Sequence, residues 1–375
     1  MRSSCLPVRS EPSRPFGRSR GLAGSALVLL GMGLSGCGGA KDNAADSAKG
    51  AASAAAAPAA TPSAAPSTGK TFTIAMIAKS STNPVFLSGR QGAEDAAKEL
   101  TAKTGVQVTI DWLTPPEEDA TVQAQRIADA VNGGANAILL SASDASKLVA
   151  AVNDAVQRGV PVMTFDSDVP GSNRFSFYGG DDIAMGKQVM DELAKQMGGK
   201  GKIGILAGNQ NAPNLQKRVQ GVKEAAKAYP GITILGTFYH AETPQDAAAE
   251  VLREQNAYPD LQGWAMIGGW PLFTSALLTD LDPAKVKIVA VDALPAELAY
   301  VDKGLAPVLF AQPTYDWGFV SVHTIFDHVY LKKDVPAHVQ MDLVRVSKDN
   351  LGTWARQLKA WGFTDVDPKY LALAK

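Results

Sequence analysis

Short apolar segments alternate with longer amphipathic segments from about residue 71 to about residue 331. The apolar segments are rich in Ile, Val, Leu and Ala, which is typical of strands buried on both faces. They occupy residues 72–78, 106–112, 137–140, 160–165, 203–206, 232–239, 264–267, 288–291 and 308–311. The longer segments repeat their apolar residues at helical spacing. They predict helices at 86–103, 119–132, 148–156, 182–197, 213–228, 244–257, 272–279 and 314–331.

This alternation predicts parallel sheets whose strands are joined by crossover helices. About ten strands are more than one open sheet comfortably holds, so we expect two α/β halves. In sheets of this kind, ligands bind at the carboxyl ends of the strands. The residues that directly follow each strand are therefore the candidates for a functional site.

The first 36 residues have the pattern of a secretory signal peptide. Residues 1–20 carry five arginines and one acidic residue, and residues 21–34 are small and apolar. This apolar stretch is shorter than the ~20 residues that span a bilayer, but it suits the core of a signal peptide. The match of residues 31–36 to the dinucleotide fingerprint G-x-G-x-x-G carries no weight, because it lies in this removed segment and not between a strand and a helix.

The apolar stretch ends in Leu34-Ser35-Gly36-Cys37, which resembles a bacterial lipobox. The resemblance implies cleavage before Cys37 and lipid attachment to that residue, and several acyl chains give stable membrane anchoring. The alternative is a secreted protein in which Cys37 occurs by chance. Residues 38–69 are mostly Ala, Ser, Pro, Thr and Gly, so we expect residues 37–70 to form a flexible tether.

Composition excludes several classes of protein. The chain has 375 residues with a net charge of −1, so it lacks the basic surface of a nucleic-acid-binding protein. Two cysteines exclude a disulfide framework, and four histidines make a histidine-built metal centre improbable. We predict no metal and no cofactor.

Carboxylates, amides and aromatic rings dominate the residues that follow the predicted strands. Such groups suit a neutral polyhydroxylated ligand, because carboxylates and amides hydrogen-bond to hydroxyls and aromatic faces cover the C–H side of a sugar ring. For any one residue, the alternative is that an Asp or Asn caps the next helix. The residues include Asn83, Trp112, Asp166, Asp168, Asn209, Asn214, Gln216, Trp270, Asp292, Gln312 and Trp317.

An ordered set of short motifs resembles the periplasmic ribose/galactose-type sugar-binding proteins. The first is Ser81-Thr82-Asn83-Pro84-Val85-Phe86, followed by Gly89 and Gly92. Further similar motifs, in the family's order, are Gly133-Gly134-Ala135, Gly159-Val160-Pro161-Val162, Phe165-Asp166-Ser167-Asp168, Tyr178-Gly179 with Asp181, and Val291-Asp292. The resemblance covers about residues 71–345.

The resemblance implies the type I periplasmic binding protein fold, with two Rossmann-like lobes joined by a three-segment hinge near 173–180, Gln312 and 338–345. We expect one lobe from 71–176 with 313–340 and the other from 177–312 with 341–375. It also implies a monomer that captures a monosaccharide or polyol outside the cytoplasm by hinge closure and delivers it to the permease of an ABC importer. Membrane attachment would be through the lipid anchor at Cys37.

Family contacts can be carried over to single positions of this chain. Asn83, Phe86 and Asp166 match ligand contacts of the first lobe, and Asp292 and Gln312 match a carboxylate and a hinge amide of the second. Gln216 stands where the ribose type has an arginine. The predicted ligand-binding residues are Asn83, Phe86, Trp112, Asp166, Asn214, Gln216, Trp270, Asp292 and Gln312.

The chain departs from the family pattern at three places. Val85 replaces an aromatic residue, Ser167 replaces an arginine, and Gly269-Trp270 replaces Asn-Asp. These departures argue against ribose itself as the ligand. We hypothesise that Trp270 supplies the stacking face that Val85 lacks.

The sequence bears differently on three other functions. An enzyme is disfavoured because no nucleophile elbow, P-loop or H-E-x-x-H motif is present. A sugar-responsive repressor would carry a DNA-binding helix-turn-helix where this chain has the lipobox and tether. A lipoprotein that presents its bound solute to a membrane receptor stays open as the alternative to transport.

Overall fold

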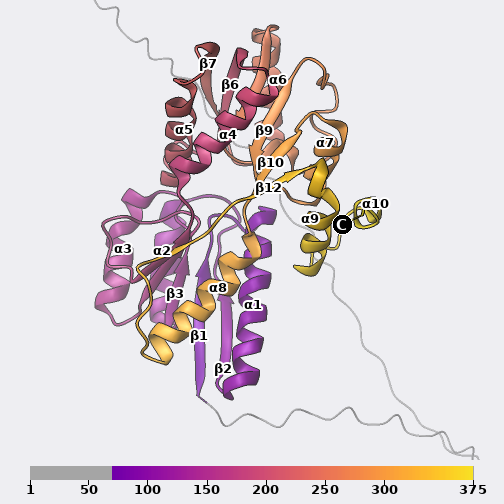
Figure 1. Ribbon diagram of the computed structural model, residues 1–375. Coiled ribbons are helices and arrows are strands. Elements are labelled where there is room, and N and C mark those ends of the chain that lie inside the picture. Colours follow the sequence, from indigo (N-terminus) through magenta and orange to yellow (C-terminus); the bar gives the residue numbers. More distant parts are fainter. Residues whose placement is uncertain (1–69, 375) are drawn as a thin grey trace, which may run out of the picture. The chain divides into compact units, whose positions relative to one another are not determined.

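The computed structural model describes residues 70–374. The predicted signal peptide, Cys37 and the tether up to residue 69 lie outside these described residues. Within the described part, twelve strands form two six-stranded sheets, as the alternation of strands and helices predicts (Figure 1).

The first sheet has the strand order β11-β5-β4-β3-β1-β2, and all its pairs are parallel. Helices α1 and α8 cover one face of this sheet, and α2 and α3 cover the other. Successive residues of a strand face opposite layers, so Ile74 and Met76 pack toward α1 and α8 while Ala75 and Ile77 pack toward α2 and α3. The bounds are β1 (Thr71–Ile77), α1 (Pro84–Thr104), β2 (Gln107–Trp112), α2 (Ala120–Asn132), β3 (Ala137–Leu140), α3 (Ala145–Gln157), β4 (Val162–Phe165), β5 (Ser176–Gly179), α8 (Thr314–Ile325) and β11 (His338–Gln340).

The second sheet repeats this strand order as β12-β10-β9-β8-β6-β7, with β12 antiparallel to β10. Helices α4 and α5 cover one face, and α6, α7, α9 and α10 cover the other. The bounds are α4 (Asp182–Gln196), β6 (Lys200–Ala207), α5 (Pro213–Ala226), β7 (Gly231–Tyr239), α6 (Pro244–Ala257), β8 (Leu261–Met266), β9 (Lys287–Val291), α7 (Leu298–Lys303), β10 (Val308–Ala311), β12 (Val344–Ser347), α9 (Leu351–Ala360) and α10 (Pro368–Leu371).

Glycines allow the helix pairs on these sheets to approach closely. A Cβ on Gly92 of α1 would lie 2.0 Å from the carbonyl oxygen of Tyr315 in α8. A Cβ on Gly186 of α4 would lie 2.0 Å from the carbonyl oxygen of Arg218 in α5. Each sheet therefore carries one helix pair that is in backbone contact and leaves little room for sliding.

The chain passes between the two sheets three times, each time through a short segment. The passages follow β5, β10 and β11, at residues 180–181, 312–313 and 341–343. They fall at the three places where a hinge was predicted. Strand β5 pairs with β4 and β11 in the first sheet, so this sheet continues past residue 176, where the lobe boundary was predicted.

One predicted element was wrong, and three short strands were not predicted. The predicted helix at 272–279 is a 3₁₀ turn at Trp270–Leu272 followed by further turns. Its buried residues Trp270, Leu272 and Leu278 do not recur at helical spacing. The short strands β5, β11 and β12 were not predicted, because three or four residues leave too little periodicity to recognise.

The predicted last helix at 314–331 is α8 followed by a π-helical turn at Phe326–Tyr330. The prediction of one long helical segment there is confirmed, although its last turn is wider than an α-helical turn.

Candidate functional site

The carboxyl ends of strands from both sheets meet at one small cavity of about 30 Å³. Seven of the nine predicted ligand-binding residues line it. They are Asn83, Phe86, Asp166, Asn214, Trp270, Asp292 and Gln312. Side chains from both sheets line this space.

Asp166 and Asp292 occupy equivalent positions in the two sheets. Asp166 follows β4 and Asp292 follows β9, and β4 and β9 have the same place in the two strand orders. The backbone N–H of each aspartate donates to the neighbouring strand, to Tyr178 in β5 (3.0 Å) and to Phe310 in β10 (2.9 Å). Both aspartates have positive φ, 55° and 81°, a conformation that costs energy for a residue with a side chain. The fold thus stores backbone strain at the two carboxylates that face the cavity.

Neutral donors hold each carboxylate. Ser141 Oγ donates to Asp166 Oδ2 (2.8 Å), and Asn214 Nδ2 donates to Asp166 Oδ1 (3.1 Å). Gln312 Nε2 donates to Asp292 Oδ1 (2.8 Å), and the backbone N–H of Gly269 donates to Asp292 Oδ2 (3.1 Å). Burial raises the pKa of Asp292, while the Gln312 hydrogen bond and the charge of Arg218 act against this rise.

Arg218 is a buried residue of the site that the sequence analysis missed. Its guanidinium donates to Asp182 Oδ1 (2.9 Å), to the carbonyl oxygen of Ile267 (3.2 Å) and to Gln312 Oε1 (3.0 Å). Because Gln312 accepts from Arg218, its amide nitrogen is directed at Asp292. Burial raises the pKa of Asp182 to about 6, although the charge of Arg218 opposes this.

A sequence signal for Arg218 was available. It lies on the apolar face of α5 with Leu215, Val219 and Val222, at helical spacing. A charged residue on a buried helix face needs a partner in the interior.

Lys79 is the second missed residue. It follows β1 and is buried, and its Nζ lies 3.4 Å from Asn214 Oδ1 and 3.9 Å from Asp166 Oδ2. Burial disfavours the ammonium, but the charges of Glu242, Asp166 and Glu118 together raise the pKa of Lys79. An ammonium has three donors, so the long bond to Asn214 leaves it capacity to donate to a ligand.

Aromatic rings enclose the cavity from both sheets. Phe86 and Trp317 lie 5.7 Å apart between ring centroids in the first half. Trp270 enters from the second half, and a Cβ on Gly268 would lie 2.5 Å from its ring. Gly268 therefore makes the space for the indole beside Asp292.

Two predicted residues do not reach the cavity. Trp112 ends the edge strand β2, and its ring lies beneath the guanidinium of Arg90, 5.4 Å from the ring centroid. Gln216 is exposed and donates to the carbonyl oxygen of Gln210. Trp112 does not reach the cavity because an edge strand ends away from the centre of the sheet. Gln216 does not reach it because its side chain points to the other side of α5 from Arg218.

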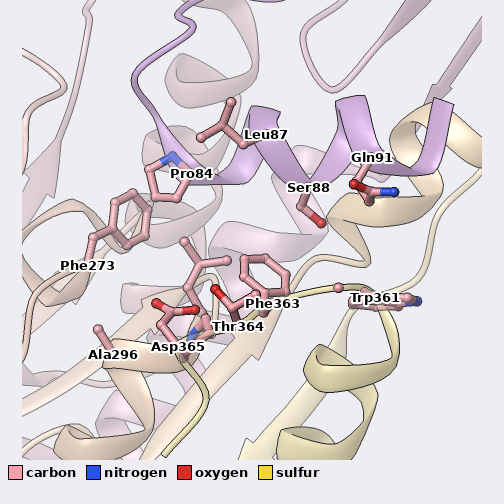
Figure 2. Close-up of a pocket in the computed structure, with 13 residues that line it drawn as sticks. Pro84, Leu87, Ser88, Gln91, Phe273, Ala296, Trp361, Phe363, Thr364 and Asp365 are labelled. Atoms are coloured by element: carbon pink, nitrogen blue, oxygen red, sulfur yellow. The ribbon is translucent and has the colours of Figure 1, made fainter. Parts of the chain in front are cut away.

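A larger groove of about 360 Å³ lies elsewhere, between the start of α1 and residues 361–365 (Figure 2). Phe273, Trp361 and Phe363 line it, and Asp365 is its one charged side chain. It contains none of the nine predicted residues. Its lining is mostly apolar, and its polar side chains are Ser88, Gln91, Thr364 and Asp365.

No cluster of three or more His, Cys, Asp or Glu side chains in residues 70–374 is arranged to hold a metal ion. No helix in the same part of the chain is both long and apolar enough to cross a membrane.

Comparison with known proteins agrees with this architecture. Residues 74–333 match the family described as periplasmic binding protein domain. The chain is 26% identical over 278 residues to the ribose import binding protein of Escherichia coli, covering 74% of this chain and 90% of that protein. It is 28% identical over 157 residues to the ribose import binding protein of Bacillus subtilis, covering 42% of this chain and 49% of that one.

The fold also matches a solved structure. An ABC transporter solute-binding protein from Burkholderia graminis, in complex with D-arabinose, superposes with a TM-score of 0.70 at 24% identity. The superposition covers 75% of this chain and 97% of that one. The predicted fold class, two lobes of the type I periplasmic binding protein kind, is confirmed.

Proposed function

The chain belongs to the periplasmic binding protein family, and from this premise we propose that it binds a monosaccharide or polyol between its two lobes for an ABC importer. The relatives described above are binding proteins of transport systems, so the prediction of a binding protein rather than an enzyme is confirmed. Delivery to a permease belongs to the proposal.

The observation that carries this proposal is the pair Asp166 and Asp292. Two carboxylates at equivalent strand ends face one cavity, with the amides of Asn83, Asn214 and Gln312 beside them. Carboxylates and amides are the acceptors and donors that vicinal hydroxyls need. The rings of Phe86, Trp270 and Trp317 supply apolar faces for a sugar ring.

Ligand entry requires the lobes to move apart. The residues that line the cavity come from both lobes, so a sugar can reach it only between them. The three short passages between the sheets are the places where such a motion can occur. A ligand that contacts both lobes stabilises the closed arrangement by its differential affinity for that state.

The site differs from that of the ribose type at positions that matter for selectivity. Ser167 and Gln216 stand where the resemblance places arginines, and Arg218 directs its guanidinium at Asp182 and Gln312. We therefore propose a sugar or polyol other than ribose.

The remaining parts of the proposal concern the position of the protein in the cell. We propose a signal peptide over residues 1–36, a lipid anchor on Cys37 and a tether to residue 70. The protein is then a monomeric lipoprotein of the cell envelope that faces away from the cytoplasm. The lobe boundaries at 176, 312 and 340 stay predictions.

A thermal-shift screen of the purified protein tests the binding function. The panel contains pentoses, hexoses, inositols, nucleosides and amino acids. A ligand at about 100 times its dissociation constant adds ~2.7 kcal/mol of stability, so one sugar or polyol should raise the melting temperature clearly. A shift with amino acids or nucleosides alone would contradict a carbohydrate ligand.

A further inference from the structure

A second cavity, of about 650 Å³, lies next to the central one. Glu242 lines both, so the two spaces meet at this side chain. We call the second space the side cavity. Its volume falls within the range of ~300–1,000 Å³ that is usual for small-molecule sites.

The side cavity lies on the side of the cleft away from the hinge. Its lining comes from the ends of β1, β2, β6 and β7 and from the segments that follow them. These four strands stand at one end of the two strand orders. Strands β5, β10 and β11, after which the chain passes between the sheets, stand toward the other end. The side cavity is therefore on the side where the lobes separate most when the hinge opens.

The side cavity stays open although the two halves are in contact. Asn214 Nδ2 joins them through its bond to Asp166 (3.1 Å). At the side cavity itself, Asn209 Nδ2 of the second half donates to the carbonyl oxygen of Ser143 in the first (3.4 Å). A group in the side cavity can therefore be held without keeping the lobes apart.

The exposed part of the lining has the groups that suit a neutral hydroxylated ligand. The amides of Gln210 and Asn211 and the carboxylate of Glu117 are exposed there, and amides and carboxylates hydrogen-bond to hydroxyls. Tyr239, at the end of β7, keeps 44% of its surface exposed. An aromatic ring of this kind covers the C–H face of a sugar ring.

The charges around the junction of the two cavities favour a neutral group. The Glu242 carboxylate accepts from the backbone N–H of Asn209 (2.9 Å), and its charge helps to raise the pKa of Lys79, which balances it from the central side. Since a carboxylate has about four acceptor positions, Glu242 can also accept from hydroxyls. Among the described residues that line the side cavity, none is a lysine or an arginine. An anionic group such as a phosphate would therefore lack a counter-ion there.

We propose, on the basis of the function proposed above, that the side cavity is a second sugar subsite, so that the ligand is a neutral disaccharide. One ring lies between Asp166 and Asp292, and the second lies over Tyr239 and donates to the amide and carboxylate groups around it. The glycosidic linkage passes Glu242, where the two cavities meet.

Calorimetric titration with matched sugars tests this subsite. The pairs are D-xylose with xylobiose, D-glucose with maltose and cellobiose, and D-galactose with lactose and melibiose. D-ribose, D-arabinose and inositol are titrated beside them. One disaccharide should bind at least about tenfold tighter than its monosaccharide, which corresponds to 1.4 kcal/mol.

Variants locate the preference. Gln210→Trp places a large side chain in the side cavity, and Tyr239→Ala removes its ring. Each should weaken binding of the disaccharide by at least about tenfold and leave the affinity for the monosaccharide unchanged. Gln125→Trp, at an exposed position of α2 where the amide bonds to Asp129, is the matched control and should change neither affinity. Melting temperatures of all variants establish that they are folded.

The outcomes separate the two proposals. A monosaccharide or polyol that binds tightly, with no disaccharide binding better, would overturn the second subsite and leave the proposed function intact. A disaccharide preference that survives both Gln210→Trp and Tyr239→Ala would also overturn it. Absence of binding by every sugar, single or double, would overturn the proposed function and the second subsite together.

Discussion

Asn214 Nδ2 donates a 3.1 Å hydrogen bond to Asp166 Oδ1, and the same amide accepts from Lys79 through Oδ1. Asn214 belongs to α5 of the second half, whereas Asp166 and Lys79 follow strands of the first sheet. The polar groups that face a ligand are here hydrogen-bonded to one another across the two halves. A sugar has to replace these contacts with its own hydroxyls, so its affinity is a difference between two sets of hydrogen bonds.

Replacing Asp292 with alanine should greatly weaken ligand binding. The change removes the acceptor of Gln312 and Gly269 and leaves ligand hydroxyls unpaired, at ~1–3 kcal/mol for each buried group. Calorimetric titration with the ligand found in the screen measures the loss. Asp302→Ala, at an exposed aspartate that pairs with Lys369, is the control. An unchanged dissociation constant for Asp292→Ala would remove Asp292 from the site.

Trp270→Ala should weaken binding, whereas Trp270→Phe should retain much of the affinity. The indole ring lines the cavity. Aromatic contacts contribute ~0.5–1.5 kcal/mol in addition to the effect of the buried area. Titration of both variants with the same ligand checks this. If alanine bound as well as tryptophan, the stacking role that compensates for Val85 would be wrong.

Arg218→Lys should weaken binding more than it destabilises the fold. Lysine can still pair with Asp182, but it cannot also hold Gln312 Oε1 and the Ile267 carbonyl. We expect Gln312 to lose its fixed orientation toward Asp292. Ligand affinity and the denaturant midpoint are measured together, with Arg253→Lys at an exposed position as the control. A full loss of stability with normal affinity would contradict a positioning role.

Gly92→Ala should destabilise the protein by ~1–3 kcal/mol, as overpacking does. The new methyl would meet the Tyr315 carbonyl at 2.0 Å, so α1 and α8 must separate. Gly89→Ala in the same helix is a matched control, because its nearest contact would be an ordinary 3.4 Å. Urea denaturation of both variants measures the difference. Equal midpoints would mean that the two helices are not held in fixed contact.

Two buried glutamates, Glu118 and Glu297, should make a contribution to stability that falls as the pH rises above about 4.5, because folding raises their pKa values. Burial, and then the charge of Asp292, raises the pKa of Glu297 well above its unfolded value, and burial with Glu242 does the same for Glu118. A raised carboxyl pKa means that the folded state binds the proton more tightly. This stabilisation is complete below the unfolded pKa and is lost as the pH passes the folded pKa.

Glu297→Gln isolates this contribution. At pH 8 the variant should melt above the unmodified protein, because a neutral glutamine is buried without taking up a proton. At pH 5 the two should melt nearly together. Thermal denaturation at both pH values, with Glu94→Gln as control, provides the measurement. A variant that is less stable at pH 8 would show that Glu297 is ionised in the folded protein.

The sequence predicted the fold well because the patterns that indicate strands and helices are local in the sequence. Each buried strand and amphipathic helix can be recognised from the spacing of its own apolar residues. The polar residues that follow the strands then lie close together, because parallel strands end at the same edge of a sheet. The failures at Trp112 and Gln216 had another cause, because edge position and helix phase decide where a side chain points. Lys79 was missed because nothing in its local sequence indicates that a lone lysine after a strand will lie beside Asn214 of the other half.

The three passages between the sheets also affect the order in which the protein can be completed. The first sheet receives its last strand from residues His338–Gln340, and the second receives its last strand from Val344–Ser347. A chain that has been synthesised only to residue 333 therefore leaves β5 and β10 as open strand edges, which are sites for aggregation. The first half has all its strands once residue 340 has been made, whereas the second half also needs Val344–Ser347, so both keep an open edge until synthesis is nearly complete.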